Sequence, residues 1–262
     1  MFVELRDVIL GTIQGLTEFL PVSSSAHLAV IPWLFGWNDP GLAFDVALHL
    51  GTLMALLIYY RRDWLAMIVA VVKGGREQRR LLLFLIVASI PGAVFGLLFE
   101  KQAETVFRSP LLIASTMTAL GIVLWVFDRR PRRLKRTVAD MTLGDALLIG
   151  LSQAFAIIPG VSRSGVTITA ALALRMRRDD AANFSFLMAT PIIAGAGLIK
   201  AHELIRNGLD SALAAGFIAS TVFGLLAISM LVNYVRTRSY RPFVWYRIAF
   251  AALVVVVYLA RA

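Results

Sequence analysis

Two polar sequences interrupt apolar stretches of the chain, and both contain side chains suited to chemistry on a phosphate. The first includes Gln14, Glu18, Ser24 and His27. Gln14 and Glu18 are four residues apart, which places them on one face of a helix. A carboxylate in apolar sequence is costly at membrane depth and commonly marks a functional site. We therefore interpret Glu18 as a site residue; the structural alternative is a glutamate that binds another helix or lies at the membrane surface.

Three consecutive serines, at 23–25, follow Glu18 and precede His27. Serines before an apolar periodic run are natural N-caps, but capping accounts for only one of them. The cluster therefore predicts a polar pocket that includes Ser23. Ser24 or His27 could act as the nucleophile, and His27 could equally be a general acid or base. The structural alternative for His27 is a buried histidine without a chemical role.

The second polar sequence is Ser162, Arg163, Ser164 and Gly165, directly before the apolar run 166–174. Free backbone N–H groups at a helix start, two hydroxyls and a guanidinium together form a receptor for an anion, and phosphate suits it best. The alternative for Arg163 is a positive charge that only sets membrane orientation. Because Arg163 lies inside an apolar stretch, we interpret it as a phosphate ligand.

Two further spacings have less specific meanings. Asp45 and His49 are again four residues apart, at the start of a predicted membrane span. They either support the polar site from behind or lie among lipid headgroups, and both interpretations stay open. Gly11 and Gly15 form a small-xxx-small step, for which close helix packing is favoured over ligand binding.

The composition requires that these residues be positioned within a membrane. Of 262 residues, 59% are hydrophobic and 16% charged, and the mean hydropathy is +0.77. These values are typical of a polytopic membrane protein and exclude an intrinsically disordered chain. The chain has no cysteine, so disulfides and thiolate chemistry are excluded. The net charge of +10 comes largely from short Lys/Arg clusters between apolar runs, which predicts orientation signals and no nucleic-acid binding.

Eight apolar regions organise the chain. Two of them, 5–37 and 143–174, are broken in the middle by clusters of Pro, Ser and Gly, and each half is too short to cross about 30 Å of hydrocarbon. They are predicted to be re-entrant helical hairpins, which require a turn that is buried in protein or lines a polar cavity. The other six are predicted to be transmembrane helices: Phe44 to Tyr60, Leu81 to Phe99, Pro110 to Phe127, Phe184 to His202, Ala212 to Val235, and Pro242 to Ala260.

The positive charges predict the orientation of these elements. Segments 61–80 and 129–136 hold six Lys or Arg each, and 175–178 and 236–241 hold three each. The positive-inside rule places these four segments in the cytoplasm and both termini outside. The first hairpin then enters from outside and the second from the cytoplasm, so that their tips point at each other.

The two hairpins align at an offset of 139 residues, which pairs Gly11 with Gly150, Gln14 with Gln153, Ser23 with Ser162 and Ser25 with Ser164. Each hairpin is followed by three spans, and an odd number of crossings inverts the second copy. The prediction is an all-α integral membrane fold in one transmembrane domain, 1–262, built as an inverted-topology repeat of about 1–128 and about 143–262.

The motifs Gln14-Gly-Leu-Thr-Glu18-Phe-Leu-Pro-Val-Ser-Ser-Ser-Ala-His27 and Pro159-Gly-Val-Ser-Arg-Ser-Gly-Val-Thr167 resemble those of the bacterial undecaprenyl-diphosphate phosphatases of the bacitracin-resistance type. The resemblance covers the whole chain. It implies an inner-membrane hydrolase that converts undecaprenyl diphosphate to undecaprenyl phosphate and inorganic phosphate, recycles the carrier lipid for peptidoglycan synthesis and confers bacitracin resistance. The site would face the periplasm or the outside, as both termini do.

Residue by residue, the resemblance assigns catalytic roles to Glu18, His27, Arg163 and Ser24. It assigns substrate binding to five further polar residues of the two motifs, Gln14, Ser23, Ser162, Ser164 and Thr167.

The family is linked to divalent cations, so Glu18 is the expected ligand of Mg²⁺ or Ca²⁺. Some members have a glutamate where this chain has Gln14, which removes one of two carboxylates from that site. The expected partners are undecaprenyl diphosphate and membrane lipid, without nucleic acid, and we allow for a homodimer. The alternative function is a lipid-phosphate transporter or flippase, because inverted repeats with broken helices are a transporter architecture.

Overall fold

The computed structural model describes residues 2–38, 41–104, 106–129, 134–207 and 211–261. Within these ranges every regular element is a helix, apart from one bridge between Arg136 and Met176. The basic segment 129–136 lies partly outside the described residues. The elements are α1 (Phe2–Phe19), α2 (Ser24–Phe35), α3 (Leu42–Tyr59), α4 (Arg61–Lys73), α5 (Arg76–Leu98), α6 (Glu100–Glu104), η1 (Val106–Arg108), α7 (Pro110–Asp128), η3 (Val138–Asp140), α8 (Leu143–Ala154), η4 (Phe155–Ile157), α9 (Arg163–Ala173), α10 (Arg178–Asn207), α11 (Ser211–Val235) and α12 (Arg241–Arg261).

Five described helices, α5, α7, α10, α11 and α12, are long and apolar enough to cross a membrane. A sixth span is counted if α3 and α4, which meet at a bend of 72°, are taken together. The all-helical class and five of the six predicted spans are therefore confirmed, and the sixth corresponds to one member of a bent pair.

The segment 61–80, which the charge pattern places between two membrane spans, is largely helical. It forms α4 and the first turn of α5. The apolar residues of this segment account for the helix. Met67 and Ala70 are buried, whereas the charged residues of α4 are exposed. A helix with one buried face does not need a long apolar stretch.

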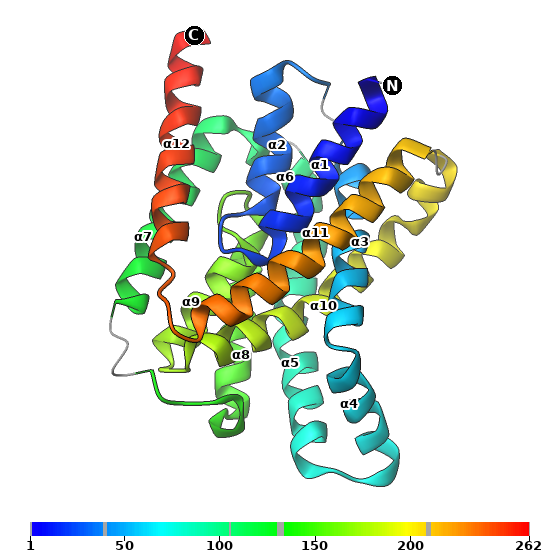
Figure 1. Cartoon of the computed structure of the whole chain (residues 1–262), viewed down its shortest axis with the longest axis vertical. Helices are drawn as coiled ribbons and strands as arrows, with labels where there is room; N and C mark the ends of the chain where they lie inside the picture. The colour runs from blue at the N-terminus through cyan, green and yellow to red at the C-terminus, as the bar shows by residue number, and fades with distance from the viewer. Residues whose placement is uncertain (1, 39–40, 105, 130–133, 208–210, 262) are drawn as a thin grey trace.

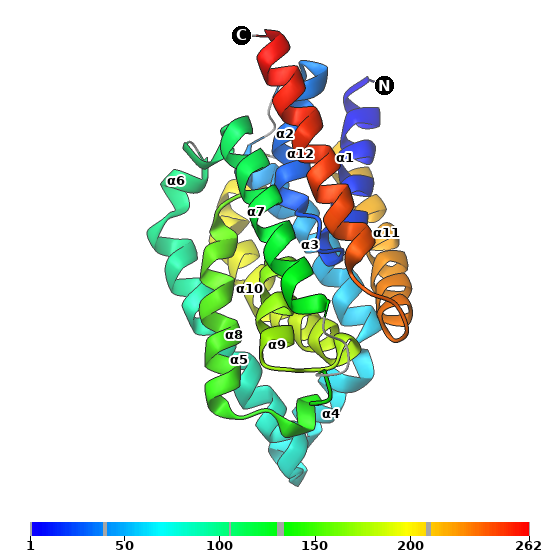
Figure 2. The ribbon, with the colours of Figure 1, turned by 90° about the vertical axis from the view of Figure 1, so that its left-hand side faces the viewer.

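The two predicted hairpins correspond to the helix pairs α1–α2 and α8–α9, in which α1 has 18 residues and is longer than predicted, while the other three helices have 11 or 12. α1 and α2 lie at the end of the molecule that carries both termini, and α4 lies at the opposite end (Figure 1). The chain enters α8 from that opposite end (Figure 2). At 12 residues each, α2 and α8 are roughly 18 Å long and too short to cross the hydrocarbon.

Glycines let the first helix of each hairpin approach a long helix closely. A Cβ at Gly15 would lie 2.6 Å from the Ser220 carbonyl oxygen of α11, and one at Gly150 would lie 2.7 Å from the Ala88 Cα of α5. Neither gap can hold a side chain. The packing interpretation of the Gly11 and Gly15 step is confirmed, since a Cβ at Gly11 would also strike the backbone of α11.

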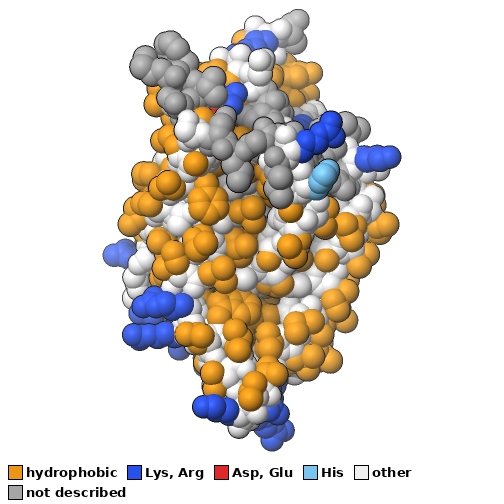
Figure 3. Space-filling model, turned by 90° about the vertical axis from the view of Figure 1, so that its right-hand side faces the viewer, with side chains coloured by type: hydrophobic (Ala, Val, Ile, Leu, Met, Phe, Trp, Pro, Cys, Tyr) orange, Lys and Arg blue, Asp and Glu red, His pale blue; other side chains and the backbone are white. Residues whose placement is uncertain are grey.

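The surface has the distribution of a membrane protein. Hydrophobic side chains cover the middle of the face in Figure 3, and most Lys and Arg side chains lie above or below this belt. Exposed Leu, Ile, Val and Phe side chains occur on all the long helices, as expected where the surrounding solvent is lipid.

Candidate active site

The turns at the two hairpin tips lie against each other. The Gly160 backbone N–H donates to the Ser23 hydroxyl oxygen at 3.1 Å. The Ser164 hydroxyl is 3.2 Å from the carbonyl oxygens of both Glu18 and Leu20. The prediction that the tips meet is therefore confirmed, and the two polar motifs form one site.

Both turns use an unusual backbone conformation at a serine. Ser23 has φ 73° and Ser162 has φ 70°, and each is the N-cap of the helix that follows. The Ser162 hydroxyl accepts from the Gly165 N–H at 3.0 Å, as a capping serine should. The Ser23 hydroxyl makes no capping bond and instead accepts from the other turn. Strain of this kind costs about 1–3 kcal/mol and is concentrated at functional sites.

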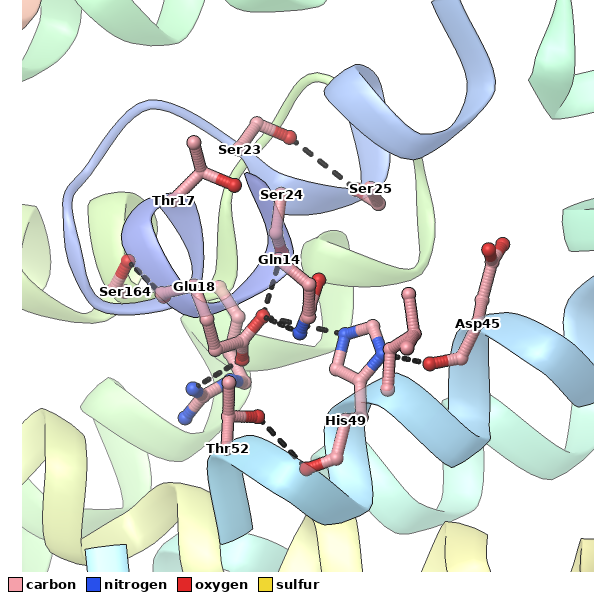
Figure 4. Close-up of polar contacts among 12 residues, drawn as sticks. Gln14, Thr17, Glu18, Ser23, Ser24, Ser25, Asp45, His49, Thr52 and Ser164 are labelled. Atoms are coloured by element: carbon pink, nitrogen blue, oxygen red, sulfur yellow. Dashed lines mark hydrogen bonds and ion pairs between the residues drawn. The ribbon is translucent and has the colours of Figure 1, made fainter. Parts of the chain in front are cut away.

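Glu18 is the point on which the site converges. It is 5% exposed. Its Oε1 accepts from Arg163 Nη2 at 2.7 Å, and its Oε2 accepts from the Ser24 hydroxyl at 2.6 Å and from Gln14 Nε2 at 3.0 Å. Dashed lines in Figure 4 join the carboxylate to Gln14, Ser24 and His49. Donors on every side stabilise the ionised carboxylate.

His49 of α3 completes the surroundings of Glu18. Its Nδ1 lies 2.6 Å from the Asp45 carbonyl oxygen, which can only accept, so Nδ1 carries a proton. Its Nε2 lies 3.2 Å from Glu18 Oε2. With Nδ1 as a donor, a second proton on Nε2 would make His49 an imidazolium paired with Glu18.

The sequence left the role of Asp45 and His49 open, and the structure places His49 at the site. Asp45 lies farther out and pairs with Arg108, Nη2 to Oδ2 at 2.6 Å. The i, i+4 spacing indicated that both residues share a face of α3, but the sequence could not show that this face packs against α1.

Arg163 is the first residue of α9 and reaches Glu18 across the two hairpins. Its Nη1 also donates to the Ser185 carbonyl oxygen at 3.4 Å. Thr167 lies one turn later, where its hydroxyl is 2.6 Å from the Ser185 hydroxyl and 2.8 Å from the Arg163 carbonyl oxygen. Thr167 is fully buried, so it holds Arg163 and Ser185 in place from behind.

His27 lies elsewhere. Its Nδ1 contacts the Ser23 carbonyl oxygen and its Nε2 contacts the Tyr246 hydroxyl, both at 2.7 Å. The ring stacks on Phe250 with centroids 4.4 Å apart. The bond to Ser23, one turn back along α2, directs the ring toward α12. The structure therefore brings Glu18 and Arg163 together and does not bring His27 to them.

A cavity of about 370 Å³ opens beside this cluster. Its polar lining includes some of the groups named above, and small and apolar residues of α5 and α10 form much of the remaining wall, with others from α3, α6, α8 and η4. Gln153 also lines it and has a buried Oε1 atom without a hydrogen-bond partner among the described residues. Of the predicted site residues, the lining includes Glu18, Ser24, Ser162 and Arg163, and it does not include Gln14, Ser23, His27, Ser164 or Thr167. Ser25, Asp45, His49, Arg108 and Gln153 line it without having been predicted as site residues.

The residues present do not form a site for a divalent cation. Both oxygens of Glu18 already accept from donors, and the guanidinium of Arg163 beside Oε1 would oppose a cation there. Across the part of the chain that the structure describes, no group of three or more His, Asp or Glu side chains is arranged to hold a metal. We derive no step through Mg²⁺ or Ca²⁺, and metal binding by Glu18 stays a prediction.

Comparison with known proteins supplies the family. Residues 7–253 match the family described as bacitracin resistance protein BacA. The chain is 54% identical over 258 residues to a protein of Moorella thermoacetica, and 98% of each chain is covered. It is 49% identical over 255 residues to one of Pelotomaculum thermopropionicum, with 97% and 96% covered, and 47% identical over 268 residues to one of Geobacter sulfurreducens, with 98% and 99% covered. All three relatives are named undecaprenyl-diphosphatase. This chain, a multi-pass membrane protein, belongs to the BacA family of bacitracin resistance proteins.

Proposed function

We propose that this protein is an undecaprenyl-diphosphatase, which removes the terminal phosphate of undecaprenyl diphosphate and so recycles the carrier lipid for peptidoglycan synthesis. The relatives compared above carry this name, and they are up to 54% identical to this chain. The observation that carries the proposal is the contact of Glu18 with Arg163, in a cavity lined by serines of both turns. Bacitracin resistance follows from the same activity in the family.

The positive groups around the cavity suit a diphosphate. Arg163, Arg108 and Lys200 line the cavity together with His49, against the carboxylates of Glu18 and Asp45, so the lining has a positive excess for an anion. The N-terminus of α9 adds backbone N–H groups and the positive end of a helix dipole. A guanidinium can bind two phosphate oxygens at once and stabilise the charge that develops during transfer.

Ser24 is the nucleophile in this proposal. Its hydroxyl donates to Glu18 at 2.6 Å and lines the cavity, so Glu18 can accept its proton as the oxygen attacks phosphorus. The bond from the terminal phosphorus to the bridging oxygen breaks, and undecaprenyl phosphate leaves. Water then hydrolyses the phosphoserine to inorganic phosphate and restores Ser24. His27, with both ring nitrogens bonded away from the cavity, positions the start of α2.

The proposed orientation has the cavity and both termini facing the outside of the bacterial inner membrane. The cavity lining includes residues of α3, η1 and the C-terminal part of α10, and these stretches lie toward the end of the molecule that carries the termini (Figure 1). The basic segment 61–80, which forms α4 and the start of α5, lies toward the other end (Figure 1). The discharged carrier lipid arrives on the outer face, so a cavity that opens on that face can bind it directly.

We also propose that the chain is an inverted-topology repeat. Ser23 and Ser162, 139 residues apart, share a positive φ and an N-cap position. The first helix of each hairpin packs by a glycine on a long helix of the other half, α1 on α11 and α8 on α5. This exchange of partners is what a two-fold relation between the halves produces.

Release of inorganic phosphate from undecaprenyl diphosphate by the detergent-purified protein tests the proposal. We expect steady release by the parent protein and none above background by Ser24→Ala, with Ser115→Ala on the surface of α7 as the control. Mass spectrometry of a quenched reaction should find phosphate on Ser24. A transporter would move the lipid across vesicles without releasing phosphate. Activity retained in folded Ser24→Ala would remove the serine mechanism and leave direct attack by water.

A further inference from the structure

Arg247 is the largest side chain that is fully buried in the described structure, and neither motif contains it. It lies in the first third of α12 and is 0% exposed. Its hydrogen bonds to described residues all go to backbone carbonyl groups. A buried cation that is bonded only to carbonyl groups needs a reason, because desolvating it is costly.

The guanidinium joins both hairpin turns to a third helix. Nη1 donates to the Pro21 carbonyl oxygen of the first turn at 3.1 Å. Nη2 donates to the Gly160 carbonyl oxygen of the second turn at 2.7 Å, and both Nη atoms lie 3.3 Å from the Val161 carbonyl oxygen. Nε donates to the Met117 carbonyl oxygen of α7 at 2.9 Å. One side chain thus satisfies carbonyl groups that have no water to bind at this depth.

The charge of Arg247 complements the ends of the helices that lead into the turns. Pro21 lies just after the end of α1, and Gly160 and Val161 lie just after α8 and η4. Helix C-termini are the negative ends of the helix dipoles, so a cation placed there is stabilised. The N-termini of α2 and α9, which follow the same turns, supply the opposite, anion-binding ends.

The surrounding sequence leaves space for this side chain. A Cβ at Gly165 would lie 3.0 Å from Arg247 Nη1, and one at Gly121 would lie 3.4 Å from Nε. The preceding residue, Tyr246, holds His27 of α2 through its hydroxyl at 2.7 Å. Two adjacent residues of α12 therefore contact the first hairpin, and one of them also contacts the second.

We propose that Arg247 is a positioning residue for the phosphatase reaction, one that fixes the register of the two turns and thereby the placement of Ser24 relative to Arg163. Ser24 is three residues after Pro21, and Arg163 is two residues after Val161. A shift of one turn against the other therefore moves the nucleophile relative to the phosphate ligand. Small misplacements of this kind reduce the rate of a reaction more than they reduce substrate binding. The inference rests on the proposed function.

The test compares Arg247→Lys with Arg178→Lys in the detergent-purified full-length protein. Arg178 is the matched control, because its side chain is largely buried and clasps Asp128 through Nε and through a second bond to the Asp128 carbonyl oxygen, at the cytoplasmic end of α7. We measure phosphate release as kcat and KM, the melting temperature, and amide hydrogen exchange of peptides that cover 19–25 and 158–165.

For Arg247→Lys we expect a fall in kcat on the order of 10- to 100-fold, a KM within about threefold of the parent, and faster exchange confined to the two turns. Arg178→Lys should lower the melting temperature but keep kcat within about threefold. A kcat of folded Arg247→Lys within threefold of the parent, a rise in KM alone, or faster exchange throughout the protein would overturn the proposal.

Gly165→Ala supplies a second test should Arg247→Lys fail to fold. The new methyl group presses on Arg247 Nη1, while Arg247 keeps its charge. We therefore expect a fall in kcat and a local increase in exchange of the same kind, but smaller than in Arg247→Lys. Unchanged exchange at 158–165 in this variant would overturn the proposal. If the parent releases no phosphate, the proposed function fails, whereas the exchange measurements still decide whether Arg247 holds the two turns.

Discussion

At the scale of single residues, the site depends on how many hydrogen bonds one carboxylate can accept. Glu18 accepts from Arg163, Ser24 and Gln14 and pairs with His49. The carboxylate therefore serves as an anchor that holds two cations and a hydroxyl at the edge of the cavity. When a phosphate enters, both cations have further N–H groups to offer, and Glu18 has an oxygen ready to accept the Ser24 proton.

The first prediction concerns the geometry of Arg163. Arg163→Lys keeps the charge but loses the planar fork, so the phosphate loses a preorganised donor in the transition state. We expect phosphate release to fall by on the order of 10² to 10³, equivalent to about 2.7–4 kcal/mol. Arg76→Lys, at the exposed start of α5, is the control and should keep full activity. Activity of folded, membrane-inserted Arg163→Lys within about threefold of the parent would return Arg163 to a purely topological role.

The second prediction concerns the proton on His49. His49→Gln keeps a polar side chain of similar length but cannot carry a positive charge, so the cavity loses one of the four basic side chains in its described lining. We expect kcat/KM to fall by on the order of 10²-fold, within the usual range for a group that handles a proton or a developing charge. Tyr59→Phe at the other end of α3 serves as the control. Equal kinetics for His49→Gln and the parent would show that the imidazolium has no part in the reaction.

Sequence patterns indicated which residues belong to the candidate site better than they indicated which of these residues contact each other. Glu18, Ser24 and Arg163 could be identified because a charge or a serine cluster inside apolar sequence has few structural explanations. The pattern did not separate His27 from His49, since both are lone histidines near helix starts. What distinguishes them is tertiary: α3 packs against α1 and presents His49 to Glu18, whereas His27 turns to Tyr246 of α12.

At the scale of elements, the hairpins are stabilised by close backbone contact as well as by polar bonds. α8 approaches α5 where Gly150 faces Ala88, with no room for a Cβ between the two backbones. This contact sets the depth to which α8 enters and therefore the position of the second turn. It also explains why the hairpin needs no long apolar helix to be stable.

The third prediction tests this contact. Gly150→Ala should lower the melting temperature, because a methyl group forced against backbone costs about 1–3 kcal/mol, more than the roughly 1 kcal/mol that alanine adds to a helix. Gly144→Ala in the same helix is the matched control, since its Cβ would lie 3.7 Å from the nearest atom, the Thr142 hydroxyl oxygen. That variant should keep or raise the melting temperature. Equal changes in both variants would contradict the packing argument.

Hydropathy predicted the long helices well and the short ones poorly. Spans such as Pro110 to Phe127 match the helix Pro110–Asp128 closely because an unbroken apolar run has one stable form in lipid. α4 was missed because its basic flanks, Arg61 and Lys73, were counted as parts of a cytoplasmic loop. The bend of 72° between α3 and α4 depends on packing against α5, which a window along the chain does not register.

At the scale of the whole molecule, charge and cavity lie at opposite ends. The cavity reaches Arg108 and Lys200 near the termini, while the largest basic segments belong to the α4 end. Since Lys and Arg are retained in the cytoplasm during insertion, this asymmetry supports the orientation proposed above, in which the site would receive lipid from the outer leaflet.

The last prediction tests that direction, and the absence of cysteine from the chain makes it direct. Gln102→Cys places a thiol on α6 at the end near the termini, and Gln78→Cys places one in the first turn of α5 at the α4 end; both positions are exposed. In intact bacterial cells, a membrane-impermeant maleimide should label Gln102→Cys and leave Gln78→Cys unlabelled until the membrane is permeabilised. The cysteine-free parent gives the background, and phosphate release by each variant shows that it is folded. The opposite labelling pattern would place the cavity in the cytoplasm, where the substrate would be lipid made inside the cell.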